Sequence, residues 1–154
     1  MALEKCDKIP EILGTDQDGK EVKASDYADK KLVLYFYPKD NTPGCTTQAC
    51  DMRDSMTDLN ELGVTVYGIS GDSKKKHQNF IEKHGLNFDL LVDEDFKLSE
   101  ELGVYGPKKA FGKEFNGITR TTFVIDADSN ILKRFDKVKA SAHADELKDF
   151  LKEG

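Results

Sequence analysis

The chain has 154 residues, of which 38% are hydrophobic and 34% charged, a balance typical of one soluble globular domain covering residues 1–154. Its 23 basic and 29 acidic residues give a net charge of −6, which argues against nucleic-acid and membrane-surface partners because both attract the opposite charge. No apolar run approaches the roughly 20 residues of a membrane span, and residues 1–10 do not resemble a secretory signal, so we expect a cytoplasmic protein.

Five strands are expected after a short N-terminal hairpin. Turn residues at 16–19 separate the two arms of this hairpin. Continuous apolar and aromatic runs at 31–37 and 64–70 are typical of strands buried on both faces of a sheet. Shorter strands are predicted at 90–92, 121–126 and 131–135, and the last two should pair antiparallel because only a tight turn separates them.

Amphipathic segments alternate with these strands. Apolar residues recur every three or four positions from 49 to 62, which predicts a helix of about five turns that ends at Gly63. Further helices are predicted at 73–85, 96–102 and 144–151. Residues 105–118 show no periodicity and are predicted to form a loop. The alternation indicates an α/β fold with a mixed central sheet flanked by helices.

The residues that could carry chemistry lie between the first buried strand and the first long helix. Thr42 is a favourable N-cap residue and Pro43 then occupies the first helical position, so Cys45 falls in the first turn. Free backbone N–H groups and the positive end of the helix dipole favour the thiolate there, and the thiolate is the nucleophilic form of cysteine. The spacing of Cys45 and Cys50 does not suit a zinc site, so no metal or cofactor is expected.

This pattern resembles the active-site signature of the peroxiredoxins. Pro38, Thr42 and Cys45 match its order of Pro, three residues, Thr, two residues and Cys. A second cysteine five residues later, Cys50, is typical of the bacterioferritin comigratory protein or peroxiredoxin Q branch. Residues 113–126 resemble the family's stretch around its active-site arginine. The resemblance extends over nearly the whole chain.

The resemblance implies a thioredoxin-like fold and a thiol-dependent peroxidase for hydrogen peroxide and organic hydroperoxides. Cys45 would be the peroxidatic cysteine, which attacks the O–O bond and becomes a sulfenic acid, while Thr42 would hydrogen-bond the thiolate and the peroxide. Arg120 would stabilise the thiolate and the leaving oxygen, and Pro38 would shield the thiolate from water. Cys50 would form an intramolecular disulfide with Cys45, which thioredoxin or a similar dithiol would reduce.

Two residues depart from the family pattern. Gln48 stands where the family commonly has glutamate, so this position can hydrogen-bond but brings no charge. Cys6 matches no part of the pattern, and we assign it no role. The three histidines, His77, His84 and His143, have no recognisable partner in the sequence and are interpreted as solvated or packing residues.

Two other functions remain open on the residues alone. A thioredoxin-type dithiol oxidoreductase is disfavoured because it would have two residues between its cysteines, not four. A peroxide-sensing redox switch without significant turnover is compatible with the same residues. The chain is expected to be a monomer.

Overall fold

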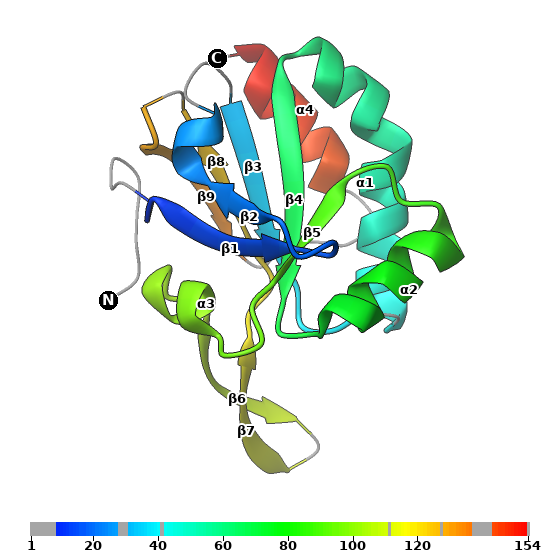
Figure 1. Ribbon diagram of the computed structural model, residues 1–154, viewed down its shortest axis with the longest axis vertical. Coiled ribbons are helices and arrows are strands. Elements are labelled where there is room, and N and C mark those ends of the chain that lie inside the picture. Colours follow the sequence, from blue (N-terminus) through cyan, green and yellow to red (C-terminus); the bar gives the residue numbers. More distant parts are fainter. Residues whose placement is uncertain are drawn as a thin grey trace.

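A seven-stranded mixed sheet forms the centre of the molecule (Figure 1). The computed structural model describes residues 9–27, 31–40, 42–110, 112–126, 128–136 and 143–153. The strand order is β2-β1-β5-β4-β3-β8-β9. In chain order these strands are β1 (Ile12–Asp16), β2 (Glu21–Lys23), β3 (Lys31–Phe36), β4 (Val64–Ser70), β5 (Asp89–Val92), β8 (Thr121–Ile125) and β9 (Ile131–Asp136).

Helices cover both faces of this sheet. On one face lie α1 (Pro43–Glu61), α2 (Lys74–His84) and α4 (His143–Glu153), and on the other lies the short α3 (Lys97–Glu101). A single turn of 3-10 helix, η1 (Ala24–Tyr27), follows β2. The mixed sheet, its flanking helices and the N-terminal hairpin β1–β2 confirm the predicted fold class.

The central strand β3 shows why the sheet needs a cover on both faces. Its side chains alternate between two hydrophobic clusters, because successive residues of a strand point to opposite faces. Leu34 and Phe36 pack in the cluster that includes α3, while Val33 and Tyr35 pack in the cluster beneath α1, α2 and α4. All four are almost completely buried, as the continuous apolar run predicted.

The strand order brings the residue before β8 close to the start of α1, although the two are far apart in the sequence. β3 pairs parallel with β4 and antiparallel with β8. In the antiparallel pair Phe36 lies opposite Thr121. Because β3 ends where β8 begins, the residue before β8, Arg120, is brought to the same edge of the sheet as the loop that leads into α1.

One prediction was wrong. Residues 105–118, expected to be a loop, form a two-stranded antiparallel sheet of β6 (Tyr105–Ala110) and β7 (Lys113–Ile118). This hairpin projects from the body of the molecule (Figure 1). Gly112 adopts a positive φ of 75° at its turn, which glycine accepts without strain. At the base of the hairpin, Tyr105 stacks on Phe96 with ring centroids 4.2 Å apart.

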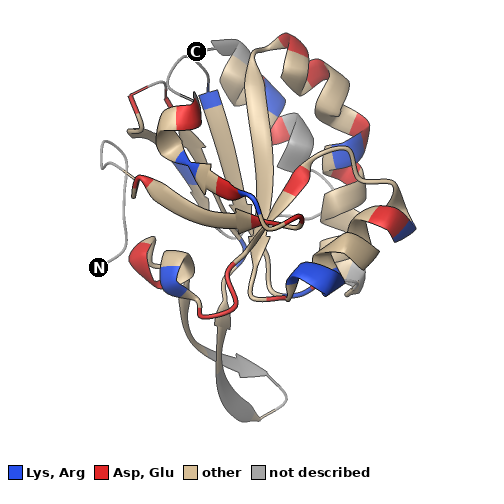
Figure 2. Ribbon diagram, viewed as in Figure 1, with Lys and Arg blue, Asp and Glu red and all other residues tan. Residues whose placement is uncertain are grey.

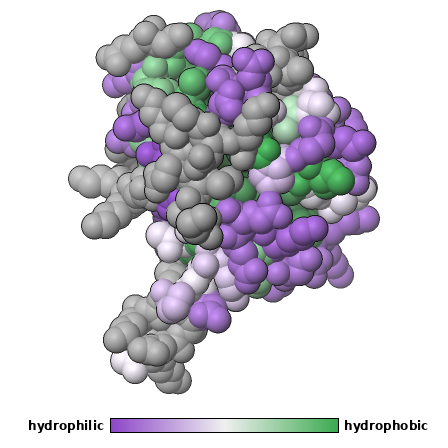
Figure 3. All heavy atoms as spheres, turned by 90° about the vertical axis from the view of Figure 1, so that its left-hand side faces the viewer, coloured by the Kyte–Doolittle hydropathy of each residue, from purple (hydrophilic) through white to green (hydrophobic). Residues whose placement is uncertain are grey.

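The remaining elements agree with the sequence. Gly63, Gly85 and Gly103 follow α1, α2 and α3 with positive φ, as residues that terminate helices do. Among the described residues, charges concentrate on the outer helices and loops while the central strands are almost free of them (Figure 2). On the face turned to the viewer in Figure 3, the described surface is largely hydrophilic with hydrophobic residues interspersed. No helix within the described part of the chain is long and apolar enough to cross a membrane.

Candidate active site

The site is built on the first turn of α1, directly after β3. Thr42 occupies the N-cap with extended backbone angles, φ −85° and ψ 152°, and Pro43 begins the helix, as predicted. Cys45 therefore lies in the first turn, where backbone N–H groups have no partner within the helix. Its side chain is only 2% exposed and packs in the cluster beneath α1. The thiol is thus held in a confined place at the positive end of a helix of 19 residues.

Arg120 supplies a cation to this buried sulfur. Its Nη2 donates to Cys45 Sγ at 3.4 Å, and its Nη1 donates to Gln48 Oε1 at 2.6 Å. Gly44 leaves room for the guanidinium, since a Cβ at that position would lie 3.1 Å from Nη2. The guanidinium fork therefore spans two positions of α1 that are three residues apart, and it faces the sulfur with a fixed positive charge.

Two buried polar groups near the sulfur have unused hydrogen-bonding capacity. Gln48 is 1% exposed and its Oε1 faces Arg120, but its Nε2 has no hydrogen-bond partner among the described residues. The hydroxyl of Tyr35 is likewise buried without a partner there. Burial, and after it the charge of Cys45, raises the pKa of Tyr35 well above its ordinary value of 10.0, so the phenol stays protonated. Both groups are unpaired donors in a site that is otherwise closely packed.

Thr42 and Pro38 lie in the loop between β3 and α1. The Thr42 hydroxyl donates to the carbonyl oxygen of Lys39 at 2.9 Å and does not cap the helix N–H groups. Because its proton is used there, the Thr42 oxygen faces its surroundings as an acceptor. Pro38 is exposed. The structure thus brings Cys45 and Arg120 into direct contact and places Thr42 at the N-cap of the helix whose first turn holds Cys45.

The second cysteine of the motif is on the same helix. Cys50 is half-buried, and both Cys45 and Cys50 are free thiols. Its position beside the apolar stripe of α1, not within it, accounts for the partial exposure. Cys6 lies outside the described residues.

The burial of His77 agrees with its interpretation as a packing residue, but the structure adds polar partners that the sequence did not show. His77 is completely buried and has partners on both ring nitrogens: Nδ1 is 2.6 Å from Asp40 Oδ2, and Nε2 is 2.8 Å from the carbonyl oxygen of Leu91. The available signal was its spacing, since His77 stands three residues before the buried Phe80 on the apolar side of α2. A histidine at a core position needs polar partners there.

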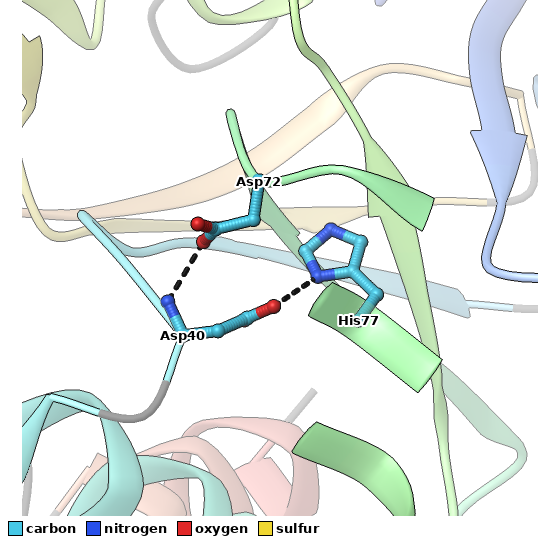
Figure 4. A group of neighbouring side chains, drawn as sticks. All are labelled: Asp40, Asp72 and His77. Carbon is cyan, nitrogen blue, oxygen red and sulfur yellow. Dashed lines mark hydrogen bonds and ion pairs between the residues drawn. The ribbon is translucent and has the colours of Figure 1, made fainter. Parts of the chain in front are cut away.

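Asp40, Asp72 and His77 are also the one group of possible metal ligands among the described residues, with ligand atoms within 4.8 Å of one another (Figure 4). The ligand atoms of Asp40 and His77 already have protein partners: the two residues bind each other, Tyr37 Oη is 2.5 Å from Asp40 Oδ1, and Leu91 takes the second ring nitrogen. A cation would have to displace these hydrogen bonds, so the group is better described as a buried polar network.

Comparison with known proteins identifies the family. Residues 6–134 match the AhpC/TSA family. Peroxiredoxin Bcp of Bacillus subtilis is 48% identical over 153 residues, which cover 99% of this chain and 98% of the relative. The chain belongs to the AhpC/TSA family and is a peroxiredoxin of the Bcp branch. Peroxiredoxin Bcp of Escherichia coli is 46% identical over 151 residues, covering 98% of this chain and 97% of its own.

Solved structures of the same branch share the fold of this peroxiredoxin. A mutant of Xylella fastidiosa PrxQ superposes with a TM-score of 0.90 at 31% identity, covering 99% of this chain and 98% of its own. Xanthomonas campestris bacterioferritin comigratory protein superposes with a TM-score of 0.86 at 33% identity, covering 96% and 98%. The structure of the latter is described as giving insights into its alkyl peroxide reduction activity. The recognition of the family, of its thioredoxin-like fold and of a peroxidase is confirmed.

Proposed function

We propose that this peroxiredoxin reduces hydrogen peroxide and organic hydroperoxides with Cys45 as the peroxidatic cysteine. The observation that carries the proposal is the contact of Arg120 Nη2 with the buried Cys45 Sγ at 3.4 Å. A cation and a helix N-terminus at one sulfur favour the thiolate, which is the reactive form. The alkyl peroxide reduction activity ascribed to the Xanthomonas campestris relative supports organic hydroperoxides as substrates.

The chemistry of the first step follows from the groups around the sulfur. The Cys45 thiolate attacks one peroxide oxygen, the O–O bond breaks, and the sulfur is oxidised to a sulfenic acid while the other oxygen leaves as water or an alcohol after taking up a proton. Arg120 stabilises the negative charge that develops on the leaving oxygen. The Thr42 oxygen, whose own proton is donated to Lys39, accepts a hydrogen bond from the peroxide O–H.

Resolution by Cys50 needs the helix to open. Both cysteines lie in α1, and five residues of regular helix separate their Cα atoms by about 8.6 Å. A disulfide rarely spans more than about 7 Å between Cα atoms. We therefore infer that the first turns of α1 unwind before the Cys50 thiolate attacks the sulfenic sulfur and releases water. Thioredoxin or a similar dithiol then reduces the disulfide by thiol exchange.

Peroxide consumption in the presence of a dithiol reductant tests this cycle. Cys45→Ser should abolish turnover, since it removes the sulfur that is oxidised, whereas Cys50→Ser should block steady-state turnover but keep a single round of peroxide reduction. Circular dichroism checks that both variants fold. Turnover retained by Cys45→Ser would remove Cys45 from the reaction. A parent protein that is oxidised once but is not recycled by any dithiol would favour the peroxide-sensing switch instead.

Amide exchange tests the opening of α1. The oxidised protein should exchange faster than the reduced protein between residues 42 and 52, because the disulfide cannot form on an intact helix. Equal exchange in the two states would show that the cysteines meet without unwinding.

We also propose that the chain acts as a single-domain monomer in the cytoplasm, with a dithiol protein as its partner and neither nucleic acid nor membrane. Sedimentation at micromolar concentration, with both redox states, tests the monomer.

A further inference from the structure

We propose that the buried pair of Asp40 and His77 is an anchor that holds the first turn of α1 in the position where Cys45 reacts with peroxide, so that His77 is a positioning residue of the peroxidase. This inference rests on the proposed function. It starts from the location of Asp40, which lies two residues before the N-cap Thr42 and yet is only 6% exposed. A carboxyl group is rarely buried in a loop unless its hydrogen bonds are all satisfied.

The pair joins the loop before α1 to a second helix. The Asp40 and His77 side chains point toward each other across the space between the β3–α1 loop and α2 (Figure 4), with Nδ1 and Oδ2 2.6 Å apart. His77 has no exposed surface, and its Nε2 reaches the Leu91 carbonyl oxygen on β5 at 2.8 Å. The loop is thereby connected through one imidazole ring to α2 and to the central sheet.

A second set of hydrogen bonds fixes the backbone of the same residue. The Asp40 N–H donates to Asp72 Oδ2 at 2.7 Å, and the Ser70 hydroxyl donates to that same oxygen at 2.7 Å. Tyr37 Oη donates to Asp40 Oδ1 at 2.5 Å. Burial, followed by the nearby Asp40 carboxyl group, raises the pKa of Tyr37 well above its ordinary value of 10.0, which keeps this donor protonated. Asp40 is therefore held at its backbone and at both side-chain oxygens.

The hydrogen-bond partners define how many protons Asp40 and His77 carry together. The Leu91 carbonyl oxygen can only accept, so His77 Nε2 carries a proton. The contact between Nδ1 and Oδ2 then needs one further proton, either on an imidazolium or on a carboxylic acid. In both arrangements the pair is neutral overall, which suits a site without solvent. Removal of one partner would leave the other buried and unpaired.

The anchor acts on the reacting cysteine through a short piece of chain. From Asp40 the chain reaches Thr42, whose hydroxyl is tied back to Lys39, and the first helical turn with Cys45 follows at once. Displacements of about 1 Å at a reacting group can cost a hundredfold in rate. The resolving step has the opposite requirement, because the first turn must leave its position. Loss of the anchor should therefore slow the peroxide step selectively.

The test compares His77→Leu with Asp40→Asn and with the control His84→Leu. Asparagine at position 40 can keep every hydrogen bond: its amide N–H₂ donates to a neutral Nδ1, and its oxygen accepts from Tyr37. His84 is on the same helix and its ring lies edge-on to Phe80, but it makes no contact with the anchor. Leucine at position 77 or 84 places an apolar side chain in α2.

Single-turnover kinetics should separate the two steps. In His77→Leu we expect peroxide to oxidise Cys45 about ten- to a hundredfold more slowly, while disulfide formation from the sulfenic acid is unchanged or faster. Asp40→Asn and His84→Leu should stay within about threefold of the parent in both steps. Rates are expressed per folded thiol, so that loss of folded protein does not imitate the effect.

Amide exchange of the reduced protein supplies a readout that does not use peroxide. Exchange between residues 42 and 50 should rise in His77→Leu and not in the other two variants. A peroxide step in His77→Leu at the parent rate, an equal slowing of both steps, or an Asp40→Asn variant as impaired as His77→Leu would each overturn the anchor. If the parent itself consumes no peroxide, the proposed function fails, and exchange alone still decides whether the anchor holds α1.

Discussion

Two buried polar clusters lie near the start of α1, one including Asp40 and His77 and the other around Cys45, and they differ in how completely their hydrogen bonds are satisfied. Before the helix, each side-chain nitrogen and oxygen of Asp40 and His77 has a partner. Around Cys45, the Nε2 of Gln48 on α1 and the hydroxyl of Tyr35 on β3 have no hydrogen-bond partner among the described residues. Buried polar atoms without partners are uncommon and often mark a place of function. The contrast fits one cluster that supports and one that reacts.

The largest effect should come from Arg120, the cation of the reacting cluster. Arg120→Ala should slow oxidation of Cys45 by peroxide about a hundred- to a thousandfold, the usual cost of removing a group that stabilises charge in the transition state. Arg120→Lys keeps the charge but loses the fork that also binds Gln48, so it should be impaired as well.

A rate of Cys45 oxidation in Arg120→Ala equal to that of the parent would show that the 3.4 Å contact with Cys45 Sγ has no part in the reaction. The cluster around Cys45 would then differ from the Asp40–His77 pair in its hydrogen bonds but not through a catalytic role of Arg120.

The second test uses two tyrosines that differ in the same way as the clusters. Tyr37 donates to Asp40, whereas the Tyr35 hydroxyl has no partner in the described part of the chain, and the two rings stack with centroids 5.4 Å apart. Tyr37→Phe should lower the free energy of unfolding by about 1–3 kcal/mol because it leaves an acceptor unpaired. Tyr35→Phe should leave the stability unchanged or raise it, because it removes a buried hydroxyl that binds none of the described residues. Denaturant unfolding at neutral pH measures both.

The same tyrosines set a dependence on alkaline pH. Burial raises the pKa of both above the value of 10.0 that they have in the unfolded chain. The unfolded state therefore releases these protons first, and stability is complete below pH 10 and decreases as the pH rises above it. In each Tyr→Phe variant, the free energy of unfolding should decrease less steeply above pH 10 than in the parent. If it decreases as steeply as in the parent in both variants, other groups cause the dependence.

The smallest effect should come from the charge at position 48. Gln48→Glu keeps an acceptor for Arg120 but pairs its positive charge, so less of that charge acts on Cys45. We expect the peroxide step to slow several-fold and the folded state to become slightly more stable. Gln48→Leu is the control that removes the hydrogen bond without adding a charge. A faster peroxide step in Gln48→Glu would contradict the view that Arg120 acts through its unpaired charge.

The residues around Cys45 could be singled out from the sequence more readily than Asp40 and His77. The helix start could be inferred from Thr42 and Pro43 because capping is local, and Arg120 could be placed by resemblance to the family. Asp40 and His77 are 37 residues apart, and no local pattern relates them. Their contact depends on β3 and β4 being neighbours in the sheet, which the order of strands along the chain does not define.

The hairpin β6–β7 was missed for a different physical reason. The base of this hairpin joins the core through Ile118 and Tyr105, but two paired strands that project from the body need no alternation of apolar and polar residues along their whole length. The segment therefore lacks the pattern by which β3 and β4 were recognised. The sequence shows Gly112, which has a positive φ in the structure. One glycine among several, however, does not by itself indicate a turn between strands.

Cys45 and Arg120 are 75 positions apart in the sequence, and this separation also orders events during protein synthesis. The chain leaves the ribosome from its N-terminus, so α1 and its cysteine emerge well before β8 has been made. Until β8 pairs with β3, the nascent chain has a thiol without the guanidinium that faces it in the finished fold. We therefore expect Cys45 to gain its contact with Arg120 only when the sheet is complete.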